Sequence, residues 1–278
     1  MARPTHVPGL AVFGFRWDLS DQQTRRWWPQ GISTIDDSML VISSYAKPIG
    51  GVREGARLTF VDRGSLRYRH VLLVEPVTAS DVRPVQVHVG GVATQNGWVH
   101  LAATGSGLRS ARLDDIVRLR RAQLHTYGYE YVLPMRLTYD ARADEGDQPL
   151  RFSFVSLSDG SLAMGEYGHG DMTTRLATFA LPSSQQDAVV RPTLLDAGGA
   201  ERMHGVAVVD GTWYVTTGAG PRHPGSVWVG EPGSLRRVPL TLPSGLEDLA
   251  YDAASDWLWT LTEYPRRRYV LALDRAHL

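Results

Sequence analysis

A hairpin unit that recurs along the chain is the feature that most constrains its fold. Each copy has a polar or glycine start, a short apolar strand, a tight polar turn and a second strand, often opened by Trp. The copies are "WWPQGISTIDDSMLVISSY" from Trp27, "HVGGVATQNGWVHLAATGSG" from His88, "MHGVAVVDGTWYVTTGAG" from Met203 and "LEDLAYDAASDWLWTLTEY" from Leu246. A weaker fifth copy begins at Val132. Self-similar hairpins at a regular spacing predict the blades of a β-propeller.

The spacing between these junctions predicts the number of blades. Successive junctions lie on average roughly 54 residues apart, close to the period of about 40 to 50 that four-stranded blades show. We therefore expect an all-β chain that forms a single five-bladed β-propeller with mainly four-stranded antiparallel blades over residues 1–278. The inner strands are expected to begin near residues 30, 90, 135, 204 and 247.

Composition narrows the classes of partner. Lys plus Arg and Asp plus Glu each number 29, so the net charge is zero and nothing indicates a nucleic-acid partner. The chain has no cysteine, which excludes disulfides, thiolate nucleophiles and thiolate-bound metals. No stretch approaches the ~18 apolar residues of a membrane span. The expected partner is therefore a small molecule, with no nucleic acid and no membrane, and the oligomeric state stays open.

Targeting and cofactor motifs are not found in the sequence. Pro4, Pro8 and Gly9 precede a short apolar run and Arg16 ends it, unlike an export leader, so the sequence as given predicts a cytoplasmic location. The chain contains no G-x-S-x-G elbow, no H-E-x-x-H, no P-loop and no Rossmann fingerprint. We therefore expect no cofactor.

The propeller prediction places a candidate site at one mouth of the central channel. The first strand of each blade lines the channel, and the second strand returns to the end where the first began. The predicted mouth comprises Trp28, Gln30, Tyr45, His88, Met135, Glu166, Tyr167, His204, Glu247, Glu263 and Tyr264. Glu247, His204 and His88 are the expected catalytic residues, and the other eight are expected to bind substrate.

Acid–base chemistry is the role that these catalytic residues suit. Burial would raise the pKa of Glu247, and a facing histidine moves protons near neutral pH. The same residues could instead hydrogen-bond to one another and plug the channel. Asp248 faces the opposite way from Glu247 on a strand, so we expect it to bond backbone amides of a neighbouring blade.

Two further interpretations of the acidic residues remain open. Glu166 and Glu263 each precede Tyr, in "GEY" and "TEY", which favours a structural ion pair with Arg136 or with the arginines at 266–268. Two histidines and two glutamates could also hold a divalent metal ion, although the sequence contains no compact ligand motif that indicates such a site.

Several words of the sequence resemble one protein family. They are "WWPQGIS", "RYRHVLLVEP", "HVGGVA", "YVLP", "RFSFVSL", "GEY", "WYVTT", "EDLAYD" and "LWTLTEYPRRRYVLA". In these words the chain resembles a family of actinobacterial (Streptomyces-type), usually secreted, five-bladed β-propeller proteins. The resemblance implies the fold and no particular activity. The chain differs from the family pattern in four features. His204 and Met135 each stand where the family has Gln, "AATG" around Ala103 stands where the family has "ADTG", and the sequence as given shows no export leader.

These observations lead to one expected function and two alternatives. The expected function is a cofactor-independent natural-product biosynthetic enzyme of the cyclase, isomerase or lyase type. Its mouth would fold a mostly apolar intermediate while His and Glu side chains move protons. One alternative is a non-catalytic interaction scaffold, which predicts a mouth sealed by His88, His204 and Glu247. The other is a glycan-active propeller that uses paired carboxylates.

Overall fold

The computed structural model describes residues 1–52, 54–78, 81–119, 126–143, 148–158, 160–180, 189–190, 193–195 and 198–278. Within these ranges the regular secondary structure is almost entirely β-strand, with one short α-helix, α1 (Leu19–Gln23), and the 3-10 turns η1 (Leu113–Asp115) and η3 (Arg275–His277). No helix among the described residues is both long enough and apolar enough to cross a bilayer.

The described strands form five sheets. The first contains β3 (Trp27–Asp36), β4 (Met39–Ala46), β5 (Ala56–Asp62), β6 (Tyr68–Pro76), β12 (Tyr131–Pro134) and β11 (Val117–Arg118), with β7 (Val82–Pro84) paired to β6. The second contains β8 (Val92–Gln95), β9 (Trp98–Ala102), β10 (Leu108–Arg112), β13 (Leu137–Ala141) and β17 (Val189–Val190). The third contains β14 (Phe152–Ser158), β15 (Ser161–Glu166), β16 (Leu176–Phe179) and β18 (Thr193–Leu195). The fourth contains β19 (Met203–Val209), β20 (Thr212–Thr217), β21 (Ser226–Gly230) and β22 (Arg236–Arg237). The fifth contains β23 (Leu246–Asp252), β24 (Trp257–Thr262), β25 (Val270–Asp274), β2 (Ala11–Arg16) and β1 (Arg3–Pro4).

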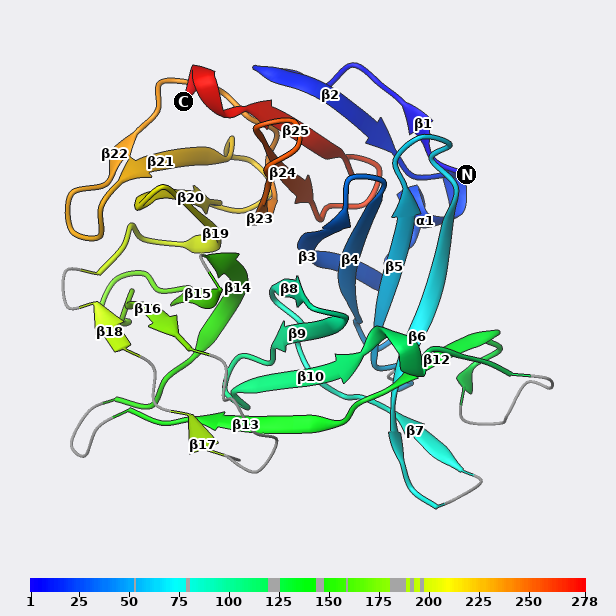
Figure 1. Ribbon diagram of the computed structural model, residues 1–278. Coiled ribbons are helices and arrows are strands. Elements are labelled where there is room, and N and C mark those ends of the chain that lie inside the picture. The colour runs from blue at the N-terminus through cyan, green and yellow to red at the C-terminus, as the bar shows by residue number, and fades with distance from the viewer. Residues whose placement is uncertain are drawn as a thin grey trace.

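The sheets are arranged around a common centre (Figure 1). Each sheet has one innermost strand, and β3, β8, β14, β19 and β23 contact one another in a closed ring. The N-terminal strands β1 and β2 join the C-terminal strands in one sheet, so the two ends of the chain close the ring. This arrangement of small, mostly antiparallel sheets is a β-propeller, which confirms the expected all-β propeller class.

Glycines let the inner strands approach one another closely. A Cβ atom on Gly91 would lie 2.3 Å from the backbone nitrogen of Val155, and one on Gly205 would lie 2.4 Å from Cα of Asp248. Only a residue without a side chain allows such an approach between two backbones. At this level the ring closes into a floor of main-chain atoms, and the predicted mouth lies on one side of it.

The prediction that an inner strand begins near residue 135 is wrong. The strand that ends there, β12, pairs in parallel with β6 on the outer side of the first sheet, and the inner strand of the third sheet is β14. Val132 and Leu133 are both buried. A strand with both faces buried has the continuous apolar pattern of a central strand, which explains the error.

The blades are also less uniform than the expected four strands. The third and fourth sheets have four strands, whereas the others have more. The additional strands come from the N-terminus and from the segment around β11 to β13, which crosses from the second sheet to the first and back. These strands extend the outer edges of the sheets and leave the ring of inner strands unchanged.

Candidate functional site

The side chains of the mouth lie at irregularities in strand pairing. The pairing register shifts between Pro29 and Ile32 in β3, between Met203 and Gly205 in β19, and between Leu246 and Leu249 in β23. These shifts are β-bulges, which free one or two residues from the ladder and re-aim their side chains. The freed residues include the predicted site residues Gln30, His204 and Glu247, described in the next paragraphs.

The central pair of the mouth is His204 and Glu247. Nδ1 of His204 lies 3.0 Å from Oε2 of Glu247, and the two side chains are 23% and 4% exposed. Burial raises the pKa of Glu247, and His204 only partly offsets this effect. Burial would lower the pKa of His204, but the negative charge of Glu247 outweighs it and the pKa of His204 is raised. A pair of this kind shares one proton and can accept or deliver it.

A second carboxyl group, Glu263, lies beside this pair. Nε2 of Gln30 donates a hydrogen bond to Oε2 of Glu263 over 3.2 Å. Burial, and then the negative charge of Glu247, raises the pKa of Glu263 to about 7. Glu263 is therefore a proton donor at slightly acid pH and an acceptor at slightly alkaline pH.

The raised pKa of Glu263 predicts how the free energy of unfolding depends on pH. Between the ordinary pKa of 4.5 and about 7, the folded protein keeps a proton on Glu263 that the unfolded chain has released. Stability therefore falls as pH rises through this window. Glu263→Gln, which can still accept the bond from Gln30, should remove this fall. Relative to the wild type, the variant should gain roughly 2 kcal/mol in free energy of unfolding between pH 4.5 and pH 8.

Urea unfolding at several pH values measures this difference. Glu231→Gln serves as a control, because Glu231 is exposed and lies between β21 and β22, away from the mouth. If wild type and Glu263→Gln show the same pH dependence, Glu263 is not a neutral acid in the folded protein at mildly acid pH.

Aromatic rings form the walls of the mouth. The rings of Tyr167 and His204 are 5.1 Å apart, and those of Trp28 and Tyr264 are 6.0 Å apart. Burial, and then the negative charge of Glu263, raises the pKa values of Tyr45 and Tyr264, so their hydroxyl groups stay protonated at neutral pH. The mouth thus combines apolar faces with neutral donors around the acid–base groups.

His88 lies at the mouth but outside the central pair. Its ring lies 4.4 Å from that of Tyr45, and its Nδ1 is 3.5 Å from Oγ1 of Thr104. Partial burial, and then the positive charges of His204 and Lys47, lowers its pKa, so the neutral form prevails at pH 7. The structure therefore places His88 on the wall beside Tyr45, without a hydrogen bond to His204 or Glu247.

Two predicted site residues lie elsewhere. Met135 follows the outer strand β12 and packs against the hydrophobic core beside the first two sheets. Glu166 is 1% exposed and accepts hydrogen bonds from Nε and Nη2 of Arg175 at 2.9 and 2.7 Å. The structural ion pair expected for Glu166 is thus present, but its partner is Arg175, because Arg136 pairs with Asp115. Burial alone would raise the pKa of Glu166, but its hydrogen bonds outweigh this effect and lower it, so Glu166 stays ionised.

The floor beneath the site is held together by Asp248. This fully buried residue accepts hydrogen bonds on Oδ2 from the backbone nitrogens of Ile32 (3.1 Å) and Val92 (3.2 Å). Burial raises its pKa well above the usual value. The expectation that Asp248 bonds amides of neighbouring strands is confirmed, and it explains why Glu247 alone of the two carboxyl groups faces the mouth.

Two residues of the mouth were missed by sequence reasoning. Ser153 occupies a bulge in β14 that matches those of the other inner strands, and its hydroxyl accepts a hydrogen bond from the backbone of Tyr167. Lys47 places Nζ 3.2 Å from the centre of the Trp28 ring. A signal for Lys47 was present, since it stands two residues after Tyr45 at the end of β4.

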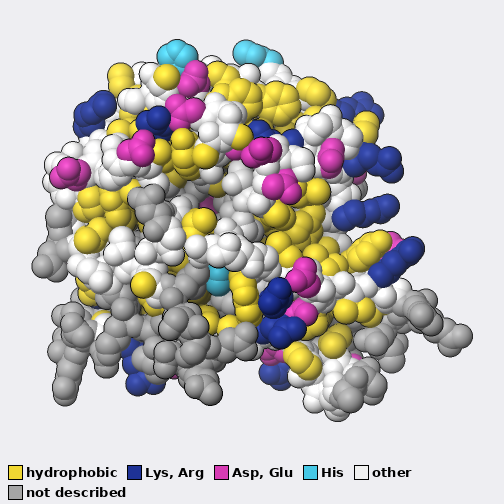
Figure 2. All heavy atoms as spheres, viewed as in Figure 1, with side chains coloured by type: hydrophobic (Ala, Val, Ile, Leu, Met, Phe, Trp, Pro, Cys, Tyr) yellow, Lys and Arg dark blue, Asp and Glu magenta, His cyan; other side chains and the backbone are white. Residues whose placement is uncertain are grey.

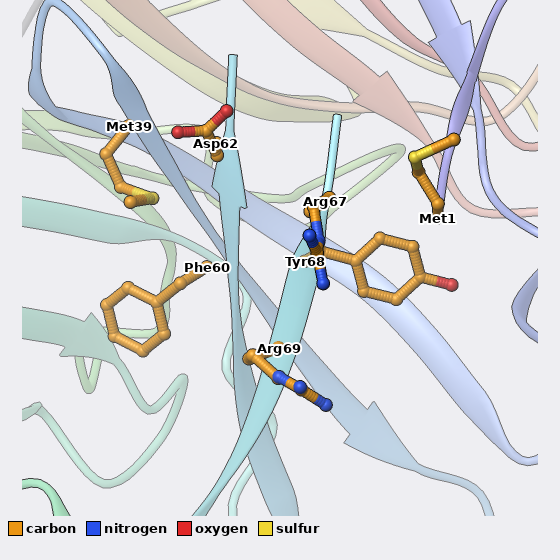
Figure 3. A pocket seen from close by; sticks show the side chains of 7 residues that line it. All are labelled: Met1, Met39, Phe60, Asp62, Arg67, Tyr68 and Arg69. Atoms are coloured by element: carbon orange, nitrogen blue, oxygen red, sulfur yellow. The ribbon is translucent and has the colours of Figure 1, made fainter. Parts of the chain in front are cut away.

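Other hollows on the protein have a different character. A cavity of about 390 Å³ lies beyond the floor, at the far ends of the inner strands, and is lined by residues such as Ser33, Thr94 and Ser156. A groove of about 450 Å³ lies on the first sheet, where Phe60, Met39 and two arginines surround it (Figure 3). It lies on the side of the molecule where β1, β5 and β6 are found, and several basic side chains project from this side (Figure 1 and Figure 2). Neither hollow has an acid–base pair like that of the mouth among its lining residues.

The described residues contain no group of three or more His, Asp and Glu side chains placed to hold one metal ion.

Comparison with known proteins supports the fold. No family model and no curated protein matches the chain. Among solved structures, the glutaminyl cyclase of Myxococcus xanthus is similar over 95% of both chains, with 10% identity and a TM-score of 0.52. A GH43 β-xylosidase/α-arabinofuranosidase from a compost microbial metagenome is similar over 99% of this chain and 95% of its own, with 10% identity and a TM-score of 0.48. The likeness to the glutaminyl cyclase, at 10% identity, concerns the propeller fold alone.

Proposed function

We propose that the chain is a five-bladed propeller enzyme that moves protons on a small-molecule substrate at the mouth, without a resident cofactor. The observation that carries the proposal is the 3.0 Å pair of His204 and Glu247, buried beside a second carboxyl group with a pKa of about 7. Perturbed acid–base groups that converge at one end of a fold are candidates for a catalytic site.

The reaction class follows from the two proton carriers. The His204–Glu247 pair can remove a proton from one atom of the substrate, while protonated Glu263 delivers one to another atom. Simultaneous removal and delivery produces a ring closure, an isomerisation or an elimination, with no net change of oxidation state. These are the reactions of a cyclase, isomerase or lyase.

The substrate class follows from the walls. Trp28, Tyr45, Tyr167 and Tyr264 offer ring faces that pack against an apolar molecule and hold it in one folded conformation. A mostly apolar natural-product intermediate suits such a mouth. That the similar M. xanthus protein is a glutaminyl cyclase is compatible with cyclisation on a propeller of this shape.

The test compares strains and purified proteins. Metabolite extracts of the producing strain should accumulate an intermediate when it carries Glu247→Gln or His204→Asn. Purified wild-type protein should convert this intermediate without added cofactor. Each variant should be slower by roughly 10² to 10⁴-fold, the usual contribution of a positioned acid or base. Glu231→Gln, an exposed residue outside the mouth, is the matched control.

Other results of this experiment would favour the scaffold or the glycan-active propeller instead. Unchanged extracts with folded, expressed variants would favour a non-catalytic scaffold. Release of sugars from glycans, lost in both Glu247→Gln and Glu263→Gln, would favour a glycan-active propeller. Membership of the actinobacterial family and the cytoplasmic location remain predictions from the sequence.

A further inference from the structure

Lys47 is the only lysine of the chain. All other basic residues among the 29 Lys and Arg are arginines, including those that form the ion pairs of the described residues. Arginine also provides cation–π contacts elsewhere, as Arg57 does on Trp27. A positive charge alone therefore does not account for a lysine at the mouth. What lysine adds is a nitrogen that can lose its proton and act as a nucleophile.

Partial burial makes the amine of Lys47 easier to deprotonate than that of an exposed lysine. The side chain is half-buried, with Nζ 3.2 Å from the centre of the Trp28 ring. No ion pair to a carboxylate is recorded for it among the described residues. Burial lowers its pKa, although the charges of Glu263 and Glu247 act in the opposite direction. Partial desolvation activates a lysine amine as a nucleophile, whereas the Trp28 ring stabilises the positive charge that the nitrogen carries before and after it reacts.

Proton carriers lie within electrostatic reach of this amine. Glu263 and Glu247 both act on Lys47 through their charges. Glu263 exchanges its proton near pH 7. The mouth therefore combines a nucleophile with a group that can supply and accept protons while a bond forms.

We propose that Lys47 captures an aldehyde or ketone substrate as an iminium ion at the mouth. This inference rests on the proposed function, because the ligand enters the same mouth, and it narrows the substrate class to carbonyl compounds. The ring of Trp28 and the nearby carboxylates stabilise the positive charge of the iminium.

The step balances without an oxidant or reductant. The ammonium group of Lys47 first gives a proton, through solvent, to ionised Glu263. The nitrogen lone pair then forms the N–C bond, and the carbonyl π electrons move to oxygen. That oxygen takes one proton from the nitrogen and a second proton from Glu263, which had received it from Lys47. The oxygen then leaves as water while the nitrogen lone pair forms the C=N bond. The net change is one ammonium and one carbonyl compound to one iminium and one water. The iminium then acidifies the adjacent C–H bond, which the His204–Glu247 pair can deprotonate.

The single lysine gives a direct test. The protein is incubated at pH 7 with benzaldehyde and sodium cyanoborohydride, which converts an iminium into a stable benzylamine, and peptides are analysed by mass spectrometry. Lys47 should be labelled at least ~10-fold faster than Nα-acetyl-lysine, below the usual contribution of a positioned general acid. Lys47→Arg should lose this label and keep its unfolding midpoint, because the charge on Trp28 remains. Glu263→Gln should label more slowly.

The outcomes separate this inference from the proposed function. Labelling of Lys47 at the rate of Nα-acetyl-lysine would show that Lys47 is not an activated nucleophile. The proposed acid–base function would then still be decided by the metabolite experiment. Rapid labelling that is equal in wild type and Glu263→Gln overturns the proton-transfer role of Glu263 in the capture. Suppose that Lys47 is labelled rapidly but the metabolite extracts of the variant strains are unchanged. This result overturns the biosynthetic function and supports the reactivity of the Lys47 amine.

Discussion

Replacing Gly91 by alanine should destabilise the protein by about 3 to 5 kcal/mol, the range of severe overpacking. The added Cβ would lie 2.3 Å from the backbone nitrogen of Val155 and 2.7 Å from Cα of Phe154. These are main-chain atoms of a neighbouring inner strand, so they cannot rotate away as a side chain would. The strands β8 and β14 would have to separate, and the floor of the mouth with them.

Thermal unfolding measures this effect, with an expected fall in Tm of roughly 10 °C. Gly105→Ala is the matched control, because no atom lies within 4 Å of the Cβ it would add. A Tm for Gly91→Ala within a degree of that control would mean that the inner strands do not meet at Gly91 as described.

The second large effect is expected for Arg268→Met. Arg268 is 1% exposed, and its guanidinium donates hydrogen bonds to three backbone carbonyls: Glu263 (2.7 Å), Asp21 (2.6 Å) and Trp27 (2.6 Å). The three residues lie directly after β24, in α1 and at the start of β3. Methionine replaces the aliphatic part of the arginine side chain but has no donors, so three carbonyls would lose their partner. The expected loss is roughly 3 to 5 kcal/mol.

Arg267→Met isolates the cause of this effect. Arg267 is the exposed neighbour of Arg268, and its substitution should change stability by less than about 0.5 kcal/mol. Chemical denaturation of both variants provides the comparison. In Arg268→Met we also expect faster proteolysis in the N-terminal segment, because Arg268 ties α1 to the closing sheet. Equal stability of the two variants would contradict the stabilising role of the three hydrogen bonds that Arg268 donates.

The regular part of the fold was predictable because it is repeated. Trp98, Trp213 and Trp257 each open a second strand after a tight turn, as the sequence pattern indicated. The inner strand β14 broke the pattern. Its hairpin follows two outer strands, β12 and β13, whose apolar residues imitate an inner strand. Long-range pairing with β6 and β10 decides their position, and local periodicity carries no information about it.

The sequence predicted which residues lie at the mouth better than it predicted the contacts that they make. The alignment of the repeated hairpins brought Glu247 and His204 to the same end of the ring, but their hydrogen bond depends on how two bulges face each other. The partner of Glu166 is Arg175, only nine residues away, yet the intervening turn had no recognisable signal. Lys47 was visible as a unique residue, but its contact with Trp28 arises from pairing of β4 with β3.

The bulges that carry the mouth residues also bear on how this scaffold can change over time. Gln30, His204 and Glu247 stand outside the regular ladders, so their side chains contribute little to strand pairing. The glycines and Asp248 beneath them hold the strands together instead. Substitutions at the bulge positions can therefore change the side chains that the mouth presents while the stability of the propeller is maintained by different residues. The mouth of this ring can evolve one side chain at a time.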